Sequence, residues 1–162
     1  MHRRLSSVLV VATLALLWVP SGVRPASGKT VGPPEIAWKD MTFEQKKAYM
    51  KASVTPTMKP IFQTFDGKKF KTFNCASCHG ADGAERKFKM PSNDIHPLPN
   101  TAEAFQAKLK TEPTWPKWTE FMSQKVEPAM GKLLDLPVFD PKKPVKGAFG
   151  CANCHKLEAA KL

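Results

Sequence analysis

Cys75-Ala-Ser-Cys-His79 is a C-x-x-C-H motif, and Cys151-Ala-Asn-Cys-His155 repeats it 76 residues further along the chain. All four cysteines of the chain lie in these two motifs. One helical turn places the two thiols of such a motif on the same side, and the histidine that follows can bind a metal there. This spacing is typical of covalent haem attachment, with two thioethers to the haem and an imidazole on the iron. We therefore predict two haem c groups, attached through Cys75, Cys78, Cys151 and Cys154 and ligated by His79 and His155.

Paired C-x-x-C motifs also occur in zinc ribbons, in thioredoxin-like redox sites and as simple disulfides. A zinc ribbon brings its two pairs together over about 15–20 residues, whereas residues 80–150 separate the two motifs here. A redox pair needs no histidine behind it, and both pairs in this chain have one. Haem attachment therefore accounts for more of each motif than the alternatives do.

The N-terminal segment has the layout of a secretory signal peptide. Arg3 and Arg4 precede an apolar run over residues 8–19, and small residues follow as far as Gly28. The run is shorter than the stretch of about 20 apolar residues that crosses a bilayer, and no cysteine near the cleavage site could carry a lipid. We expect residues 1–28 to be cleaved and the mature protein to lie in the periplasm, where haem is attached covalently.

The chain is strongly basic, with 25 Lys and Arg against 14 Asp and Glu. Cleavage of the signal peptide removes three arginines and no acid, which leaves 22 basic residues against 14 acidic ones, or a net charge of +8. Such a surface favours an acidic redox partner, because complementary fields raise the rate of encounter. The lysines also keep the protein soluble. A nucleic-acid partner does not suit an exported chain.

An internal duplication organises the sequence. Seven positions between residues 49 and 62 recur at an offset of 72, and the C-x-x-C-H motif recurs at an offset of 76, so small insertions separate the two copies. The pairs at offset 72 are Tyr49-Met50 with Phe121-Met122, Val54 with Val126, Pro56 with Pro128, Met58 with Met130, and Ile61-Phe62 with Leu133-Leu134. Between them, Phe65-Asp66 and Lys68-Lys69 match Phe139-Asp140 and Lys142-Lys143 at 74. The chain is therefore predicted to contain two copies of one unit.

Each unit is predicted to begin with an amphipathic helix. Thr42 and Gln45 have the spacing of a capping box. Apolar residues then recur every four positions, as Met50, Val54, Met58 and Phe62 in the first unit and as Trp118, Met122, Val126, Met130 and Leu134 in the second. Pro56 and Pro128 each remove a backbone hydrogen bond, so we expect a bend there.

The predicted fold is mostly α, with two duplicated helix–turn–C-x-x-C-H units around two haems and little or no β structure. Residues 1–28 are assigned to the signal peptide, residues 29–100 to haem-binding unit 1 with the loop that follows, and residues 101–162 to haem-binding unit 2. Residues 87–100, rich in Pro, Asn and Asp, are predicted to be that loop. A short helix is expected at residues 105–109.

The second axial ligand determines the chemistry of each iron. His2 lies in the signal peptide and two histidines belong to the motifs, so only His96 remains, and both haems cannot have two histidine ligands. A methionine thioether is the natural alternative, because it favours ferrous iron and raises the reduction potential. Met58 and Met130 lie at matching positions before the motifs, and we predict that they are the distal ligands.

Other assignments of the distal ligand stay open. A methionine on an apolar helical face is more often part of a core than a ligand. Met50 and Met122 are also duplicated, and the interunit loop contains Met90 and His96. An open coordination site is the remaining possibility.

A methionine-bearing helix, a turn and C-x-x-C-H, present twice over residues 42–79 and 114–155, resembles the haem-binding unit of the cytochrome subunit of photosynthetic reaction centres and the wider multihaem cytochrome c superfamily. The resemblance implies electron transfer, with each haem between the methionine helix and the helix after the motif. It assigns Met58 and Met130 as distal ligands. That subunit carries four haems and is usually tethered to a membrane, whereas this chain has two motifs and no tethering cysteine, and nothing here implies photosynthesis.

The segment from Cys75 to Gly83 also resembles the opening of a small class I cytochrome c, in which the methionine ligand comes from well downstream. On that interpretation Met122 or Met130 would serve the first haem. The match covers nine residues, whereas the duplication spans both halves of the chain.

These features predict a periplasmic dihaem electron carrier rather than an enzyme. The alternative is a peroxidase, a nitrogen-oxide reductase or a gas sensor with one open iron. Haem catalysis needs a vacant distal position with acid or base groups beside it, and only His96 could supply a distal imidazole. The expected partners are acidic redox proteins, and docking to a membrane electron-transfer complex is compatible with the same role.

Overall fold

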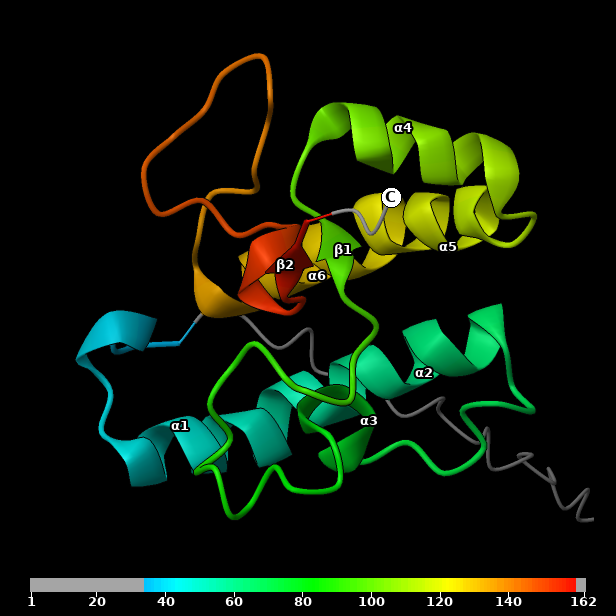
Figure 1. The fold of residues 1–162 in the computed structure, drawn as a ribbon. Helices are drawn as coiled ribbons and strands as arrows, with labels where there is room; N and C mark the ends of the chain where they lie inside the picture. Colours follow the sequence, from blue (N-terminus) through cyan, green and yellow to red (C-terminus); the bar gives the residue numbers. More distant parts are fainter. Residues whose placement is uncertain (1–33, 160–162) are drawn as a thin grey trace, which may run out of the picture.

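The computed structural model describes residues 34–159 and is built mainly from two long helical segments (Figure 1). The first comprises α1 (Phe43–Tyr49), the π-helical η2 (Met50–Val54) and α2 (Thr55–Phe65). The second comprises α5 (Trp115–Phe121), the π-helical η3 (Met122–Val126) and α6 (Glu127–Leu134). The predicted signal peptide lies outside the described residues.

The first helix begins with the predicted capping box at Thr42. The hydroxyl of Thr42 accepts a hydrogen bond from the backbone N–H of Gln45 at 3.3 Å, and the Gln45 side-chain oxygen accepts one from the Thr42 N–H at 2.8 Å. Both N–H groups lie at a helix start, where no backbone carbonyl of the helix can reach them. The sequence prediction of this cap is therefore confirmed.

Each long segment changes to π-helical geometry just before a proline. The N–H of Thr55 donates to the Met50 carbonyl, and the N–H of Glu127 donates to the Met122 carbonyl, five residues back in both cases. Pro56 and Pro128 follow in the first turns of α2 and α6. A proline has no N–H and its ring crowds the preceding turn, so a wider turn accommodates it. The predicted disturbance thus takes the form of a π segment, and the helix continues beyond it.

One apolar core joins the two segments. Its buried members are Val54, Met58, Phe62, Phe73, Phe121 and Leu133. The Phe121 ring stacks on Phe65 with centroids 3.9 Å apart and meets Phe62 edge-on at 5.2 Å. The Tyr49 hydroxyl adds a polar link by donating to the Leu133 carbonyl at 2.6 Å.

The two segments pack reciprocally. η2 contacts α6, and α2 contacts η3. Because η3 and α6 begin 72 residues after η2 and α2 respectively, these two contacts join equivalent parts of the sequence repeat. Reciprocal contacts of this kind are expected when two similar units are related by an approximate two-fold axis.

The other elements are short. They are α3 (Ala76–His79), α4 (Ala102–Thr111), the 3₁₀ turns η1 (Trp38–Asp40) and η4 (Cys151–Asn153), and the strands β1 (Leu98–Pro99) and β2 (Leu157–Glu158). β1 and β2 pair in parallel, with Leu98 opposite Leu157, and α4 lies beside α5 (Figure 1). The mostly α fold is therefore confirmed, and the predicted helix at 105–109 lies within α4. Over residues 34–159, no helix is long and apolar enough to span a bilayer.

Candidate functional site

The first motif folds as a single helical turn. The N–H of His79 donates to the Cys75 carbonyl at 2.9 Å. Asn74 closes the start of this turn, because its side-chain oxygen accepts from the Ala76 N–H at 2.9 Å and its own N–H donates to the Ser77 hydroxyl at 3.0 Å. The turn is therefore held by local bonds that the sequence itself provides.

The second motif adopts the same kind of turn. The N–H of His155 donates to the Cys151 carbonyl at 2.9 Å. The N–H of Gly150 donates to the Asn153 side-chain oxygen at 2.8 Å, as Asn74 does to Ser77 in the first motif. Both motifs thus place their two cysteines and their histidine on one turn, as the spacing predicts.

The His155 imidazole is oriented for metal binding. Its Nδ1 lies 2.7 Å from the backbone carbonyl oxygen of His96. A carbonyl can only accept a hydrogen bond, so Nδ1 carries the proton and the lone pair of Nε2 is free for a metal. A second-shell carbonyl of this kind fixes both the tautomer and the ring orientation of a ligating histidine.

The His79 imidazole has a drier environment. Its Nδ1 is buried and has no hydrogen-bond partner of acceptable geometry among the described residues. Burial lowers the pKa of His79, as does the nearby Arg86 guanidinium, whereas the backbone of Phe88 acts in the opposite direction. These effects favour the neutral imidazole, which is the form that ligates metals.

Polar residues of the interunit loop hold the end of the first motif. The Arg86 guanidinium donates to the His79 carbonyl at 2.7 Å, and the fully buried Ser92 hydroxyl donates to the same oxygen at 3.1 Å. Asp94 accepts from the Ala81 N–H at 2.7 Å. No spacing in the sequence pointed to Arg86, Ser92 or Asp94, because their contacts join residues 7 to 13 positions apart across an irregular loop.

Gly80 is required where this loop begins. Its φ angle is +80°, and a Cβ at this position would lie 2.6 Å from an Asp94 carboxylate oxygen and 2.8 Å from the Ser92 hydroxyl. A side chain would therefore meet both an unfavourable backbone conformation and the loop that wraps the motif. Glycine lets Ser92 and Asp94 approach the backbone that follows His79.

The thiols face apolar surroundings. Burial, and then the neighbouring Cys75, raise the pKa of Cys78 to about 11. The pKa of Cys154 is raised to about 12, first by burial and then by Cys78, Cys151 and Glu127. The influence of Cys78 on Cys154 places the two motifs near each other in space. Reactive redox cysteines have lowered pKa values, so these shifts have the opposite direction to those of a thioredoxin-like site.

Met58 is the best buried of the four duplicated methionines. Its side chain is 3 % exposed and belongs to the apolar core. Met50, Met122 and Met130 are partly buried and pack against the same core, as does Cys78. The structure therefore brings one thiol of the first motif and the predicted methionines to a common apolar region.

The remaining distal candidates lie in the interunit loop. The His96 residue is exposed, and its ring lies 6.0 Å from that of Trp115. Met90 is partly buried. The contact that joins His96 to the second motif is made by its backbone carbonyl, so this residue supports His155 through its main chain.

Glu127 lies near the second motif and was not predicted as a site residue. A Cβ built on Gly150, next to Cys151, would lie 3.4 Å from a Glu127 carboxylate oxygen. Burial raises the pKa of Glu127, and its charge in turn raises the pKa values of Cys151 and Cys154. The corresponding residue 72 positions earlier is Thr55. A comparison of the two repeats for charge differences could have singled out this position.

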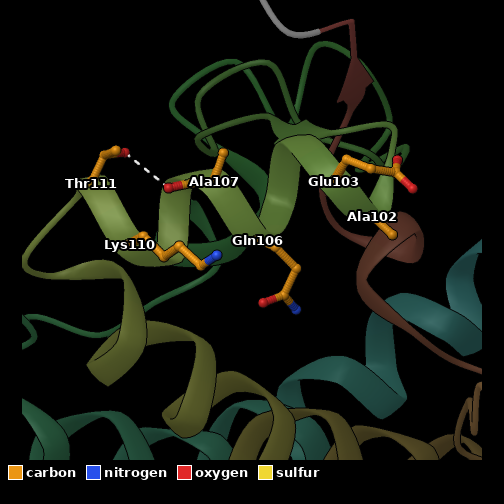
Figure 2. Close-up of a pocket in the computed structure, with 6 residues that line it drawn as sticks. All are labelled: Ala102, Glu103, Gln106, Ala107, Lys110 and Thr111. Atoms are coloured by element: carbon orange, nitrogen blue, oxygen red, sulfur yellow. Dashed lines mark hydrogen bonds between the residues drawn. The ribbon is translucent and has the colours of Figure 1, made fainter.

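A depression of about 550 Å³ runs along one face of α4 (Figure 2). Figure 2 shows that its lining comes from this helix alone, namely from Ala102, Glu103, Gln106, Ala107, Lys110 and Thr111. None of the predicted haem-binding residues lines it. The depression is therefore separate from the C-x-x-C-H site.

The donor set fits a covalently bound haem. Each motif offers two thiols on one turn, His155 has a free Nε2, and Cys78 contacts the core that contains Met58. A zinc ribbon fits less well, because residues 34–159 contain no group of three or more His, Cys, Asp or Glu side chains placed to hold a metal ion. Comparison of the chain with models of protein families, with curated proteins and with solved structures finds no match.

Proposed function

We propose that this protein is a dihaem c-type cytochrome that carries electrons in the periplasm. The first haem is attached to Cys75 and Cys78 and ligated by His79, and the second is attached to Cys151 and Cys154 and ligated by His155. Met58 and Met130 are the proposed distal ligands. Acidic redox proteins are the proposed partners, as the net positive charge favours.

The observation that carries this proposal is that two distant C-x-x-C-H motifs fold as the same turn. Each has a histidine N–H bonded to the carbonyl of the first cysteine and a polar side chain that closes the turn. In both turns the thiols can reach two positions on one edge of a planar ring while the imidazole lies under its centre. A disulfide or a redox pair would give no reason for the histidine.

The proposal of duplicated haem units has support beyond the motifs. The π segments at Met50–Val54 and Met122–Val126 begin 72 residues apart, the offset of the sequence repeat. Phe73 and Phe149, two residues before the first cysteine of each motif, are both buried. The methionines of both helices lie in or against the shared core. These agreements are expected if one ancestral unit was copied and each copy surrounds one haem.

In this proposal the haem iron supplies one-electron redox chemistry, and the chain controls its surroundings. The cysteines fix the position of each ring, and the His96 carbonyl holds the protonated Nδ1 of His155 so that Nε2 faces the iron. Arg86 and Ser92 hold the main chain at His79. The aromatic core excludes water, and methionine sulfur favours the reduced state.

The proposal is tested on protein produced together with haem-attachment machinery. We expect two covalent haems per chain in a pyridine haemochrome assay and a matching increase in polypeptide mass. The oxidised protein should show the weak near-infrared band of methionine bound to ferric iron. The control is the same chain produced without the attachment machinery. Colourless protein with the mass of the bare polypeptide would overturn the proposal, and high-spin spectra with rapid carbon monoxide binding would favour an enzyme or a gas sensor.

Replacing Glu127 with glutamine is expected to raise the reduction potential of the second haem. A carboxylate near the ring stabilises ferric iron, so its removal should raise this potential by an amount on the order of tens of millivolts. The first haem should change little, because Thr55 occupies the equivalent position there. A potentiometric titration that resolves both haems measures the effect.

Glu120→Gln is the matched control for Glu127, since it removes one carboxylate from an exposed position of α5. We expect it to leave both potentials nearly unchanged. Equal shifts of both haems in Glu127→Gln would show that net charge, rather than the position of this carboxylate, sets the effect.

A further inference from the structure

The segment between α6 and the second motif carries an exposed apolar group. We call residues 136–148 the second-unit loop. Within it, Val138, Phe139 and Val145 are 38 %, 50 % and 55 % exposed. In Figure 1 this loop, drawn in orange, extends away from the helices. Three large apolar side chains on one short loop are a feature of interaction surfaces.

Lysines surround these apolar side chains. Lys142, Lys143 and Lys146 lie in the same loop and are exposed, and none forms a salt bridge within residues 34–159. The one acid of the loop, Asp140, uses its carboxylate to accept the Lys142 backbone N–H at 2.8 Å. The loop therefore combines an apolar centre with an excess of unpaired positive charge.

The base of the loop is fixed next to the second motif. The Phe139 N–H donates to the Phe149 carbonyl at 2.8 Å, and the Phe149 N–H donates to the Pro137 carbonyl at 2.7 Å. Phe149 is buried and lies two residues before Cys151, which is itself exposed. A molecule bound to the loop would therefore lie close to the attachment point of the second haem.

The first unit lacks this surface. In the matching segment, Phe70 turns inward and meets Phe62 edge-on with ring centroids 4.9 Å apart. The Lys69 ammonium lies 4.4 Å from the centre of the Trp118 ring, so this lysine is engaged within the protein. The two units share lysines in this segment, but only the second exposes apolar side chains among them.

We propose that the second-unit loop is the surface on which an acidic redox protein docks, so that electrons are exchanged through the second haem. The lysines attract the partner and orient it, and Phe139 and Val145 supply the apolar contact that excludes water. This inference rests on the proposed electron-carrier function. It adds which haem serves the partner and which residues the partner meets.

The test compares two pairs of charge reversals in the haem-loaded protein. Lys142→Glu with Lys143→Glu changes the loop, and Lys68→Glu with Lys71→Glu makes the same change in charge at exposed positions of the first unit. The probe is reduced flavodoxin, a strongly acidic flavoprotein, and the rate of haem reduction is followed by stopped flow. Free reduced riboflavin serves as a small reductant that needs no docking surface.

At low ionic strength, we expect the loop pair to slow reduction by flavodoxin about tenfold and the control pair to slow it less than about twofold. At about 0.5 M salt the difference should disappear, because salt screens surface charges. Free riboflavin should reduce all three proteins at similar rates. Equal slowing by both pairs, or no slowing by either, would overturn the docking inference. The haem content and spectra, measured on the same samples, test the proposed function separately.

Discussion

A chain with Cys151→Ala and Cys154→Ala is expected to mature with one covalent haem instead of two. Without the thiols, no thioether can form at the second motif, while the first motif keeps Cys75, Cys78 and His79 on an intact turn. The pyridine haemochrome absorbance per chain should fall to about half, since one of two equivalent attachment sites is lost. Mass spectrometry of the denatured protein should show the loss of one haem.

The reciprocal variant, Cys75→Ala with Cys78→Ala, is the control for this experiment. It should keep the second haem, but we expect it to fold less well, because Cys78 packs against the apolar core whereas Cys151 is exposed. Loss of both haems from either variant would mean that the units mature only together. Retention of two haems would rule out attachment through these cysteines.

Met58→Ala is expected to have the largest effect on stability. The Met58 side chain is 3 % exposed within the core, and truncation of such a residue costs about 2–5 kcal/mol because a cavity remains. Met58→Leu nearly conserves the volume and should cost less than about 1.5 kcal/mol. Denaturant unfolding followed by far-UV circular dichroism measures both free energies of unfolding.

The same two variants separate a ligand from a core residue. If Met58 ligates iron, leucine removes the near-infrared methionine band of one haem and lowers its reduction potential, although the core stays filled. Met130→Leu should have the equivalent effect on the other haem, and Met50→Leu should leave both bands intact. An unchanged band in Met58→Leu, with loss of the band in Met50→Leu, would transfer the assignment to the other duplicated pair.

Local chemistry made much of this protein predictable from its sequence. The turns at the two motifs and the capping box at Thr42 form between residues three or four positions apart, so their spacing alone specifies them. The helical repeat of apolar residues likewise predicted the two long helices and the mostly α fold. The prolines were recognised as points of disturbance, but whether they bend the helix or widen it depends on how the preceding turn bonds, and the structure has a π segment at each.

Tertiary structure alone decided the surroundings of the site. The His96 carbonyl meets His155 across 59 positions, and Glu127 comes close to Gly150 because α6 and the second motif pack together. Such contacts leave no periodic pattern in a sequence. The greater burial of Met58 compared with Met50 also arises from packing between the segments, since both residues lie on the same predicted stripe. The sequence thus determined which residues can attach and ligate a cofactor, and long-range packing decided what charge, hydrogen bonding and burial each of them experiences, because those properties depend on neighbours that are distant along the chain.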